Sequence, residues 1–226
     1  MKYLAVSALC FFLCLTSQED LFPQSNDDWI EGDFWVELDP AVREPEAEYP
    51  LNKEEAAKRA LEEAQFVFSG ILFGFQFTYI PYDAAREVRE VFNISPLFVI
   101  PWGDSNLGVR SIRLEDDFLV FRIRYTLEDF LRDRLRGWRS NVIPRAGGIG
   151  KGNLLLGYRE KITAIQEGIK TALRSYAQGI VYNKPREITG EAALEKIPYI
   201  IIDSGEYSAK VEVRLRNLKI VPYSSY

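Results

Sequence analysis

The chain has 226 residues, of which 47% are hydrophobic and 13% aromatic, and a formal net charge of −5 at pH 7. This composition supplies ample apolar side chains for a buried core, so a wholly disordered chain is excluded. The acidic balance argues against nucleic acid as the main partner.

The first residues have the pattern of a secretory leader. Lys2 precedes a run over residues 3–15 that is apolar apart from Ser7, and Thr16 begins a small polar break. This order is typical of a signal peptide, and the run is shorter than the roughly 20 residues of a membrane span. We therefore expect a cleaved signal peptide over residues 1–18 and a soluble periplasmic or secreted bacterial protein.

Both cysteines, Cys10 and Cys14, lie inside this leader, and the sequence has no histidine. Leucines precede both cysteines, where a lipidated cysteine needs a small residue, so we favour simple cleavage over a lipoprotein. Thiol nucleophiles, histidine bases and the usual zinc ligands then disappear together. We expect a non-enzymatic protein with no cofactor and no metal site.

Residues 19–52 form an acidic arm, with eleven acidic residues against the single base Arg43. Most of the arm is expected to be extended and poorly packed, because charge and four prolines oppose burial. One short strand is predicted within it by apolar residues that alternate with mostly polar ones. These apolar residues are Ile30, Phe34, Val36 and Leu38.

The apolar period changes from helical to strand-like between Pro50 and Pro81. Apolar residues fall at helical spacing from Ala57 to Leu72, and Asn52 is the expected N-cap. After Gly74 the residues alternate as in a strand that ends at Pro81.

Residues 83–138 are predicted to contain both helices and strands. Asp83 can cap a short helix over residues 84–92, and strands over residues 106–114 and 118–126 form a hairpin. Helical spacing then returns over residues 127–138.

Residues 140–157, rich in Gly, Asn and Pro, are predicted to be a linker. A second long helix is expected from Arg159 to Gln178, with Gly179 as its C-cap. Apolar and alternating strands follow on either side of a turn at residues 203–206. The sequence thus predicts an α+β fold with two long helices on antiparallel sheets.

The units of this predicted fold are residues 53–139 and 158–226. Both share an order of long helix, glycine, apolar strand, acidic turn and alternating strand. Gly70 with Gly179 and Ile123 with Val211 anchor the comparison. A duplicated helix-plus-hairpin unit is one interpretation, and a chance match between two α+β segments is the other.

Four aromatic residues are candidates for an apolar ligand groove, although aromatic residues on helix and strand faces more often pack in the core. They are Phe68, Phe75, Phe77 and Tyr79.

A basic cluster follows the predicted hairpin and could contact a partner protein or lipid phosphates at a membrane surface. Its candidate residues are Arg132, Arg136, Trp138 and Arg139. Acidic residues interleave with them, which favours ion pairs within the helix.

Two short motifs match enzyme signatures incompletely. The glycines at residues 147–152 lack the spacing and the hydroxyl residue of a phosphate-binding loop. Asp203, Ser204 and Gly205 match the aspartic-protease signature, but a hairpin turn explains them better.

Residues 28–38 and 54–65 resemble the start of exported bacterial flagellar-assembly and envelope proteins of the FlgT-like and FlgP-like kind. Gly32 carries the resemblance in the first segment, and spaced alanines carry it in the second; they are Ala56, Ala57, Ala60 and Ala64. The resemblance implies an envelope-associated, non-catalytic role.

We therefore predict an exported structural or adaptor protein of the bacterial envelope, with a flagellar association among the options. Its partners would be proteins; it could touch a membrane surface without spanning it. The alternative is a periplasmic module that binds a lipid or another apolar ligand.

Overall fold

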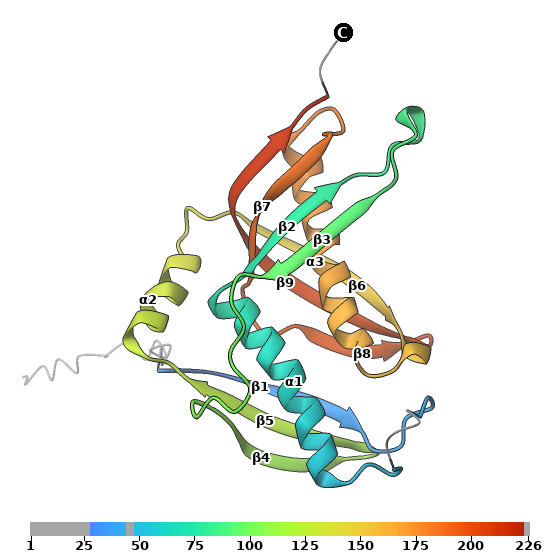
Figure 1. The fold of residues 1–226 in the computed structure, drawn as a ribbon, viewed down its shortest axis with the longest axis vertical. Helices are drawn as coiled ribbons and strands as arrows, with labels where there is room; N and C mark the ends of the chain where they lie inside the picture. Colours follow the sequence, from blue (N-terminus) through green and yellow to red (C-terminus); the bar gives the residue numbers. More distant parts are fainter. Residues whose placement is uncertain (1–27, 44–47, 224–226) are drawn as a thin grey trace, which may run out of the picture.

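The computed structural model describes residues 28–43 and 48–223, so the leader predicted over residues 1–18 lies outside the described residues. In the described part, three α-helices and nine strands form a mixed fold with two antiparallel sheets (Figure 1). The order is β1 (Trp29–Glu37), α1 (Lys53–Leu72), β2 (Phe75–Ile80), β3 (Val91–Pro96), β4 (Leu107–Glu115), β5 (Phe118–Thr126), α2 (Asp129–Trp138), β6 (Arg145–Asn153), α3 (Glu160–Ile180), β7 (Glu187–Leu194), β8 (Tyr199–Asp203) and β9 (Glu206–Val221). The predicted fold has two long helices, and the structure has a third, shorter helix, α2.

The smaller sheet has the strand order β1-β5-β4. Strand β1 pairs with β5 in unbroken antiparallel register from Trp29↔Thr126 to Glu37↔Phe118. Strands β4 and β5 form the predicted hairpin, which turns at Asp116, where φ is 51°. The strand predicted within the acidic arm is confirmed, and it belongs to the same sheet as the hairpin.

The larger sheet has the order β3-β2-β7-β9-β6, and β8 also pairs with β9. Strand β9 is 16 residues long, so it pairs with β6 along one side and with β8 and β7 along the other. Strand β2 pairs with β7 from Phe75↔Ala192 to Tyr79↔Ile188. The segment 140–157, predicted to link the units 53–139 and 158–226, therefore does not separate two sheets. Strands β2 and β3 of the first unit belong to the same sheet as β7, β8 and β9 of the second.

Helix α1 begins as predicted. The Asn52 side chain accepts a hydrogen bond from the Glu55 backbone N–H at 2.8 Å, which satisfies one of the free amides of the first turn. Its alanine face is fully buried and lets the helix approach the smaller sheet closely. The Phe68 ring meets Phe34 of β1 edge to face, with the ring centroids 5.6 Å apart.

The glycine-rich segment predicted as a linker is strand β6, paired with β9 over its whole length. Its glycines are needed because the backbone of α3 lies directly on the strand. A Cβ on Gly148, Gly150 or Gly152 would lie 2.0–2.3 Å from a backbone atom of α3. Glycine therefore serves close helix-to-strand packing here, and the prediction of a flexible linker was wrong.

Two further sequence predictions fail for identifiable reasons. The helix predicted over residues 84–92 is only a 3-10 turn, Ala84–Arg86, and Val91–Pro96 pairs with β2 instead. Strand β7 was missed, because alanine and glycine in EITGEAAL have low strand propensity. Its neighbours β2 and β9 impose the extended conformation.

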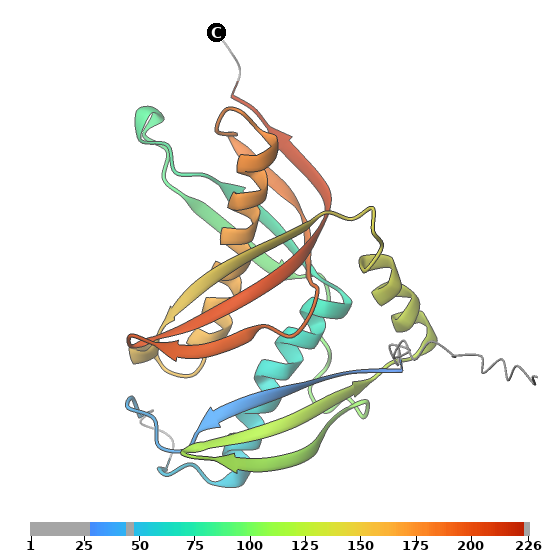
Figure 2. The same ribbon diagram turned by 180° about the vertical axis from the view of Figure 1, so that it is seen from behind.

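The two sheets meet at two unpaired strand edges. Strand β1 is an edge of the smaller sheet, and β8 pairs only with β9. Figures 1 and 2 both place β8 beside β1, with the two strands running in the same general direction. This junction contains the largest groove described below.

Candidate functional site

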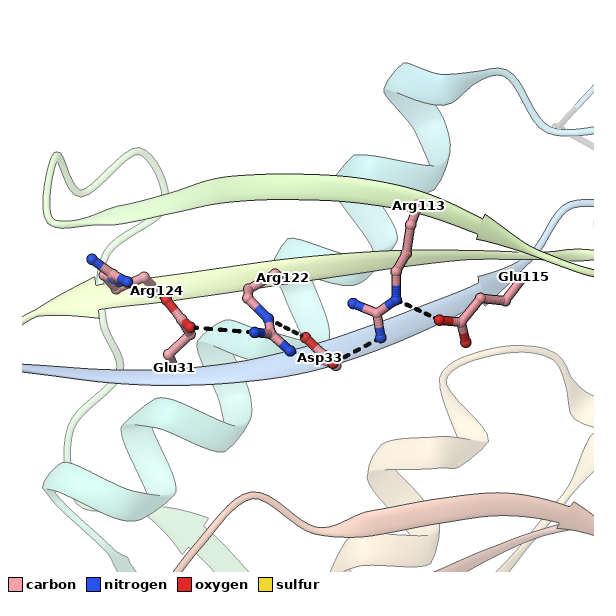
Figure 3. Close-up of polar contacts among 6 residues, drawn as sticks. All are labelled: Glu31, Asp33, Arg113, Glu115, Arg122 and Arg124. Carbon is pink, nitrogen blue, oxygen red and sulfur yellow. Dashed lines mark hydrogen bonds and ion pairs between the residues drawn. The ribbon is translucent and has the colours of Figure 1, made fainter. Parts of the chain in front are cut away.

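An ionic network covers the face of the smaller sheet that is turned away from α1 (Figure 3). Alternation along β1 sends Ile30, Phe34 and Val36 toward the core and places Glu31 and Asp33 on this outer face. The network connects three strands through the residues Glu31, Asp33, Arg113, Glu115, Arg122 and Arg124.

Asp33 is the centre of this network. It accepts hydrogen bonds from Arg122 Nε at 2.8 Å and from Arg113 Nη2 at 2.8 Å. The hydrogen bond from Arg122 is the largest cause that holds the pKa of the Asp33 carboxyl well below its usual range. The same contacts raise the pKa of both guanidinium groups. These charges neutralise one another and link β1, β5 and β4 across the outer face of the sheet.

A groove of about 500 Å³ lies between this face of β1 and strand β8. We call it the β1–β8 groove. It is lined by Asp33, Phe34, Trp35, Glu63, Val67, Arg113, Glu115, Asp116, Phe118, Val120 and residues 197–202. Its volume lies in the range of binding clefts for small molecules or peptide side chains.

Trp35 spans the groove at one end. Its indole Nε1 donates to the backbone carbonyl of Ile200 at 3.2 Å. Its ring packs edge to face on Phe118, with centroids 5.2 Å apart, and lies 6.1 Å from the ring of Tyr207. Trp35 thus holds β1 and β8 apart at a set distance.

Lys161 of α3 is buried directly beneath Trp35. Its Nζ lies 3.4 Å from the centroid of the Trp35 ring, donates to the backbone carbonyl of Trp35, and bonds Glu63 Oε2 at 3.1 Å. Burial lowers the pKa of Lys161, and the nearby Glu63 opposes that shift.

The cavity beside Lys161 has a volume of about 20 Å³, which is room for a single water molecule and too little for a substrate. Arg59 is buried on the same side, with its guanidinium 4.4 Å from the centroid of the Tyr158 ring. This buried cluster joins α1, α3 and β1, and its geometry is that of a structural junction.

The predicted ligand groove is not formed by its predicted residues. Phe68, Phe75 and Phe77 are at most 1% exposed and pack in the core. Tyr79 lines a separate pocket of about 270 Å³ between β2 and the end of α3. Its hydroxyl donates to Glu90 at 2.9 Å, and burial is the main cause that raises its pKa.

The predicted basic cluster is largely engaged within the protein. Arg132 pairs with Asp28 at 2.7 Å and also with Asp129. Arg136 lies 3.4 Å from Asp133. The partner-binding prediction is also weakened for the other two residues, because Trp138 is buried beneath Arg216, and the backbone N–H of Arg139 caps α2 by donating to Leu135.

The predicted site residues did not include Lys161, Glu63, Trp35 or any residue of β8. A signal for two of them exists in the sequence, because a charge stands on the apolar stripe of each long helix. Lys161 lies one turn before Ile165, and Glu63 lies one turn before Val67. No comparable signal brings β8 next to β1, because that contact joins residues far apart in the chain.

Within residues 28–43 and 48–223, no cluster of three or more Asp, Glu, His or Cys residues could hold a metal ion. None of the helices in these residues is long and apolar enough to span a membrane.

A protein-family model matches residues 18–223, and the chain belongs to that family. The chain is also similar to an uncharacterized protein of Treponema pallidum (strain Nichols). The two are 29% identical over 192 residues, which covers 85% of this chain and 80% of that protein. No solved structure matches the chain.

Proposed function

We propose that this family member is an exported, non-enzymatic structural or adaptor protein of the bacterial envelope that binds a partner protein in the β1–β8 groove. The observation that carries the proposal is the groove itself, about 500 Å³ between two unpaired strand edges. The leader pattern of residues 1–18 supports export. The resemblance of residues 28–38 and 54–65 supports an envelope role and keeps a flagellar association within the proposal.

The ionisable groups of the groove support a binding role over catalysis. Asp33 and Glu115 are paired with Arg113, and Glu63 is paired with Lys161. A catalytic carboxylate needs a free path to a reacting atom, whereas these groups are committed to ion pairs. Strand edges and apolar side chains make up most of the remaining lining.

The fold supports a further part of the proposal, that the two halves are related copies of one unit. In each half the strand before the long helix pairs with the last strand of a hairpin, and the registers Gly32↔Ile123 and Gly148↔Val211 correspond. An experimental structure in which the two halves superimpose with this register would support the duplication. Superposition only in another register would count against it.

The adaptor role is tested by photo-crosslinking in the bacterium that makes the protein. A photoreactive phenylalanine derivative replaces Ile201, which is 41% exposed in the groove, and a control replaces Val142, which is 87% exposed outside it. We expect one discrete protein adduct from position 201, absent from position 142, with the protein recovered outside the cytoplasm. The captured protein is then purified and must bind wild type and Val142→Asp but not Ile201→Asp.

The lipid-binding alternative is favoured by the apolar part of the same groove, including Phe118, Val120 and Ile201. It predicts a lipid adduct at position 201 in place of a protein adduct. That result, or equal protein adducts from positions 201 and 142, would contradict the adaptor proposal.

A further inference from the structure

The pocket of about 270 Å³ that Tyr79 lines lies where the end of α3 meets β2 and β7 (Figure 2). We call it the α3–β2 pocket. Its floor is apolar: Tyr79 of β2 pairs with Ile188 of β7, and Ala177 of α3 completes the surface. All three residues are buried. The pocket therefore offers a ligand an apolar base that the protein itself leaves uncovered.

The walls of the pocket come from two connected segments. Arg174, Ala177 and Gln178 stand three or four residues apart, so they lie on one side of α3. Residues 181–185, which follow the helix, also line the pocket. The Lys184 Nζ donates to the Tyr82 backbone carbonyl at 2.6 Å and so joins the segment after α3 to the segment after β2.

The carboxylates near the pocket already have partners. Glu90 accepts a hydrogen bond from the Tyr79 hydroxyl at 2.9 Å and lies 3.6 Å from the ammonium group of Lys170. Lys170 also pairs with Glu167. Arg174 differs, because its side chain makes no hydrogen bond or ion pair with any residue that the structure describes.

The stability of α3 does not account for this free guanidinium. The helix dipole acts on charges within the last turn, and Arg174 lies more than one turn before the end of α3 at Ile180. Lys170, four residues earlier, carries the same charge and repels it. Arg174 thus places an unpaired cation in the wall of an apolar pocket, where an anionic ligand can reach it.

The local charge also favours an anion. Three cations, Lys170, Arg174 and Lys184, stand against the two carboxylates of Glu90 and Glu167, which gives a local net charge of +1. The whole chain has a net charge of −5. The pocket is therefore a positive site on an acidic protein and matches a ligand with a single negative charge.

The shape and the floor of the pocket indicate the rest of the ligand. A guanidinium binds a carboxylate through two parallel N–H···O hydrogen bonds. The buried floor favours an apolar body next to that carboxylate. A cavity of roughly 150 Å³ holds one benzene molecule, so the volume of about 270 Å³ has room for about ten non-hydrogen atoms. A small organic acid fits this space, whereas a whole membrane lipid does not.

We propose that the α3–β2 pocket binds a small organic monocarboxylate, with the carboxylate on Arg174 and the apolar body on Tyr79, Ala177 and Ile188. No residue that lines this pocket also lines the β1–β8 groove. The site is therefore separate from the proposed adaptor function, and the failure of either leaves the other standing.

The test is an NMR titration of the purified, ¹⁵N-labelled protein with 3-phenylpropanoate, an acid of the stated size. We expect saturable shifts of the Val181 and Asn183 amides at millimolar concentrations, and nuclear Overhauser contacts between the phenyl ring and the Ile188 methyl groups. The uncharged analogue 3-phenylpropanamide should bind at least tenfold more weakly. The absence of saturable shifts, or equal binding of the amide, would overturn the proposal.

Propanoate tests the contribution of the apolar floor, because it keeps the carboxylate and lacks the phenyl ring. It should bind at least tenfold more weakly than 3-phenylpropanoate. Equal binding of the two acids would mean that the guanidinium alone attracts them, and the pocket would then have no role.

On the protein side, Arg174→Gln removes the free cation, and Arg110→Gln on β4 is the matched control, since Arg110 is also exposed and lies outside the pocket. The first variant should lose affinity for 3-phenylpropanoate at least tenfold, and the second should stay within twofold of the wild type. Denaturant midpoints equal to that of the wild type show that both variants fold. Equal affinity of the two folded variants would overturn the role of Arg174.

Discussion

Lys161 of α3 holds Trp35 of β1 at two points, because its Nζ lies 3.4 Å from the centroid of the indole ring and also donates to the Trp35 backbone carbonyl. Trp35 in turn donates to Ile200 of β8. The buried lysine therefore sets the position of the residue that defines one end of the groove.

Replacing Lys161 with methionine should cost about 3–5 kcal/mol of unfolding free energy, because Glu63 is then left buried without its cation. Adding Glu63→Leu should recover most of that loss. Urea denaturation of the wild type, both single variants and the double variant provides the measurement. A Lys161→Met protein as stable as the wild type would show that the pair is not held in the buried ionised form.

The same pair should give a pH dependence in the alkaline range. Burial lowers the pKa of Lys161 in the folded state below its ordinary value of 10.5. Between these two pKa values the unfolded chain binds more protons, so the contribution of Lys161 to stability rises with pH. The wild type should gain stability relative to the Lys161→Met, Glu63→Leu variant as the pH approaches 10.5. A constant difference across this range would contradict the lowered pKa.

Asp33→Asn should remove an acid-range dependence of stability. The folded-state pKa of Asp33 is lowered from 3.8, mainly by the hydrogen bond from Arg122. The stabilisation is therefore complete above about pH 3.8 and is lost as the pH falls toward the folded-state value. The wild type should exceed the variant by at most about 1 kcal/mol at neutral pH, since the network is partly exposed. Asp116→Asn, in the β4–β5 turn and outside these ion pairs, is the matched control.

Gly150→Ala should destabilise the protein by about 3 kcal/mol, because its Cβ would lie 2.0 Å from the Gly168 backbone nitrogen and force α3 away from β6. Gly147→Ala is the matched control on the same strand. Its Cβ would meet its nearest neighbour, the Val211 carbonyl oxygen, at 3.6 Å. Thermal unfolding should leave that variant within about 1 kcal/mol of the wild type. Equal effects of the two substitutions would mean that α3 does not lie on β6 as described.

Phe77→Ala should cost about 3–5 kcal/mol, because the side chain is 1% exposed and fills the core. Phe130→Ala, with the ring 61% exposed on α2, should change stability by no more than about 0.5 kcal/mol. Denaturant midpoints compare the two. A loss of stability below about 1 kcal/mol for Phe77→Ala would contradict its burial and support the prediction that it lines an open apolar groove.

Local patterns in the sequence predicted much of the secondary structure. The N-cap at Asn52, the strand in the acidic arm and the β4–β5 hairpin depend on neighbours within a few residues, and the structure contains each of them. The helix predicted over residues 84–92 failed because pairing of Val91–Pro96 with β2 outweighs a weak local helical pattern.

The glycines of β6 show why the local sequence pattern alone could not predict that this segment is a strand. Gly148, Gly150 and Gly152 look like a flexible linker in sequence, since glycine weakens any isolated strand. In the fold the same residues allow α3 to lie against the strand, and packing with a segment that follows in the chain decides their role.

The sequence by itself determined that the chain has material for a core, carries a leader pattern, lacks histidine, and forms two long amphipathic helices with antiparallel strands. These features depend on composition and on short-range periodicity. Only the tertiary structure decided that Lys161 and Glu63 pair, that Trp35 reaches Ile200, and that the edges of β1 and β8 face each other across a groove. Each of those contacts joins residues about 100 or more positions apart, and no local pattern specifies which distant edges remain unpaired.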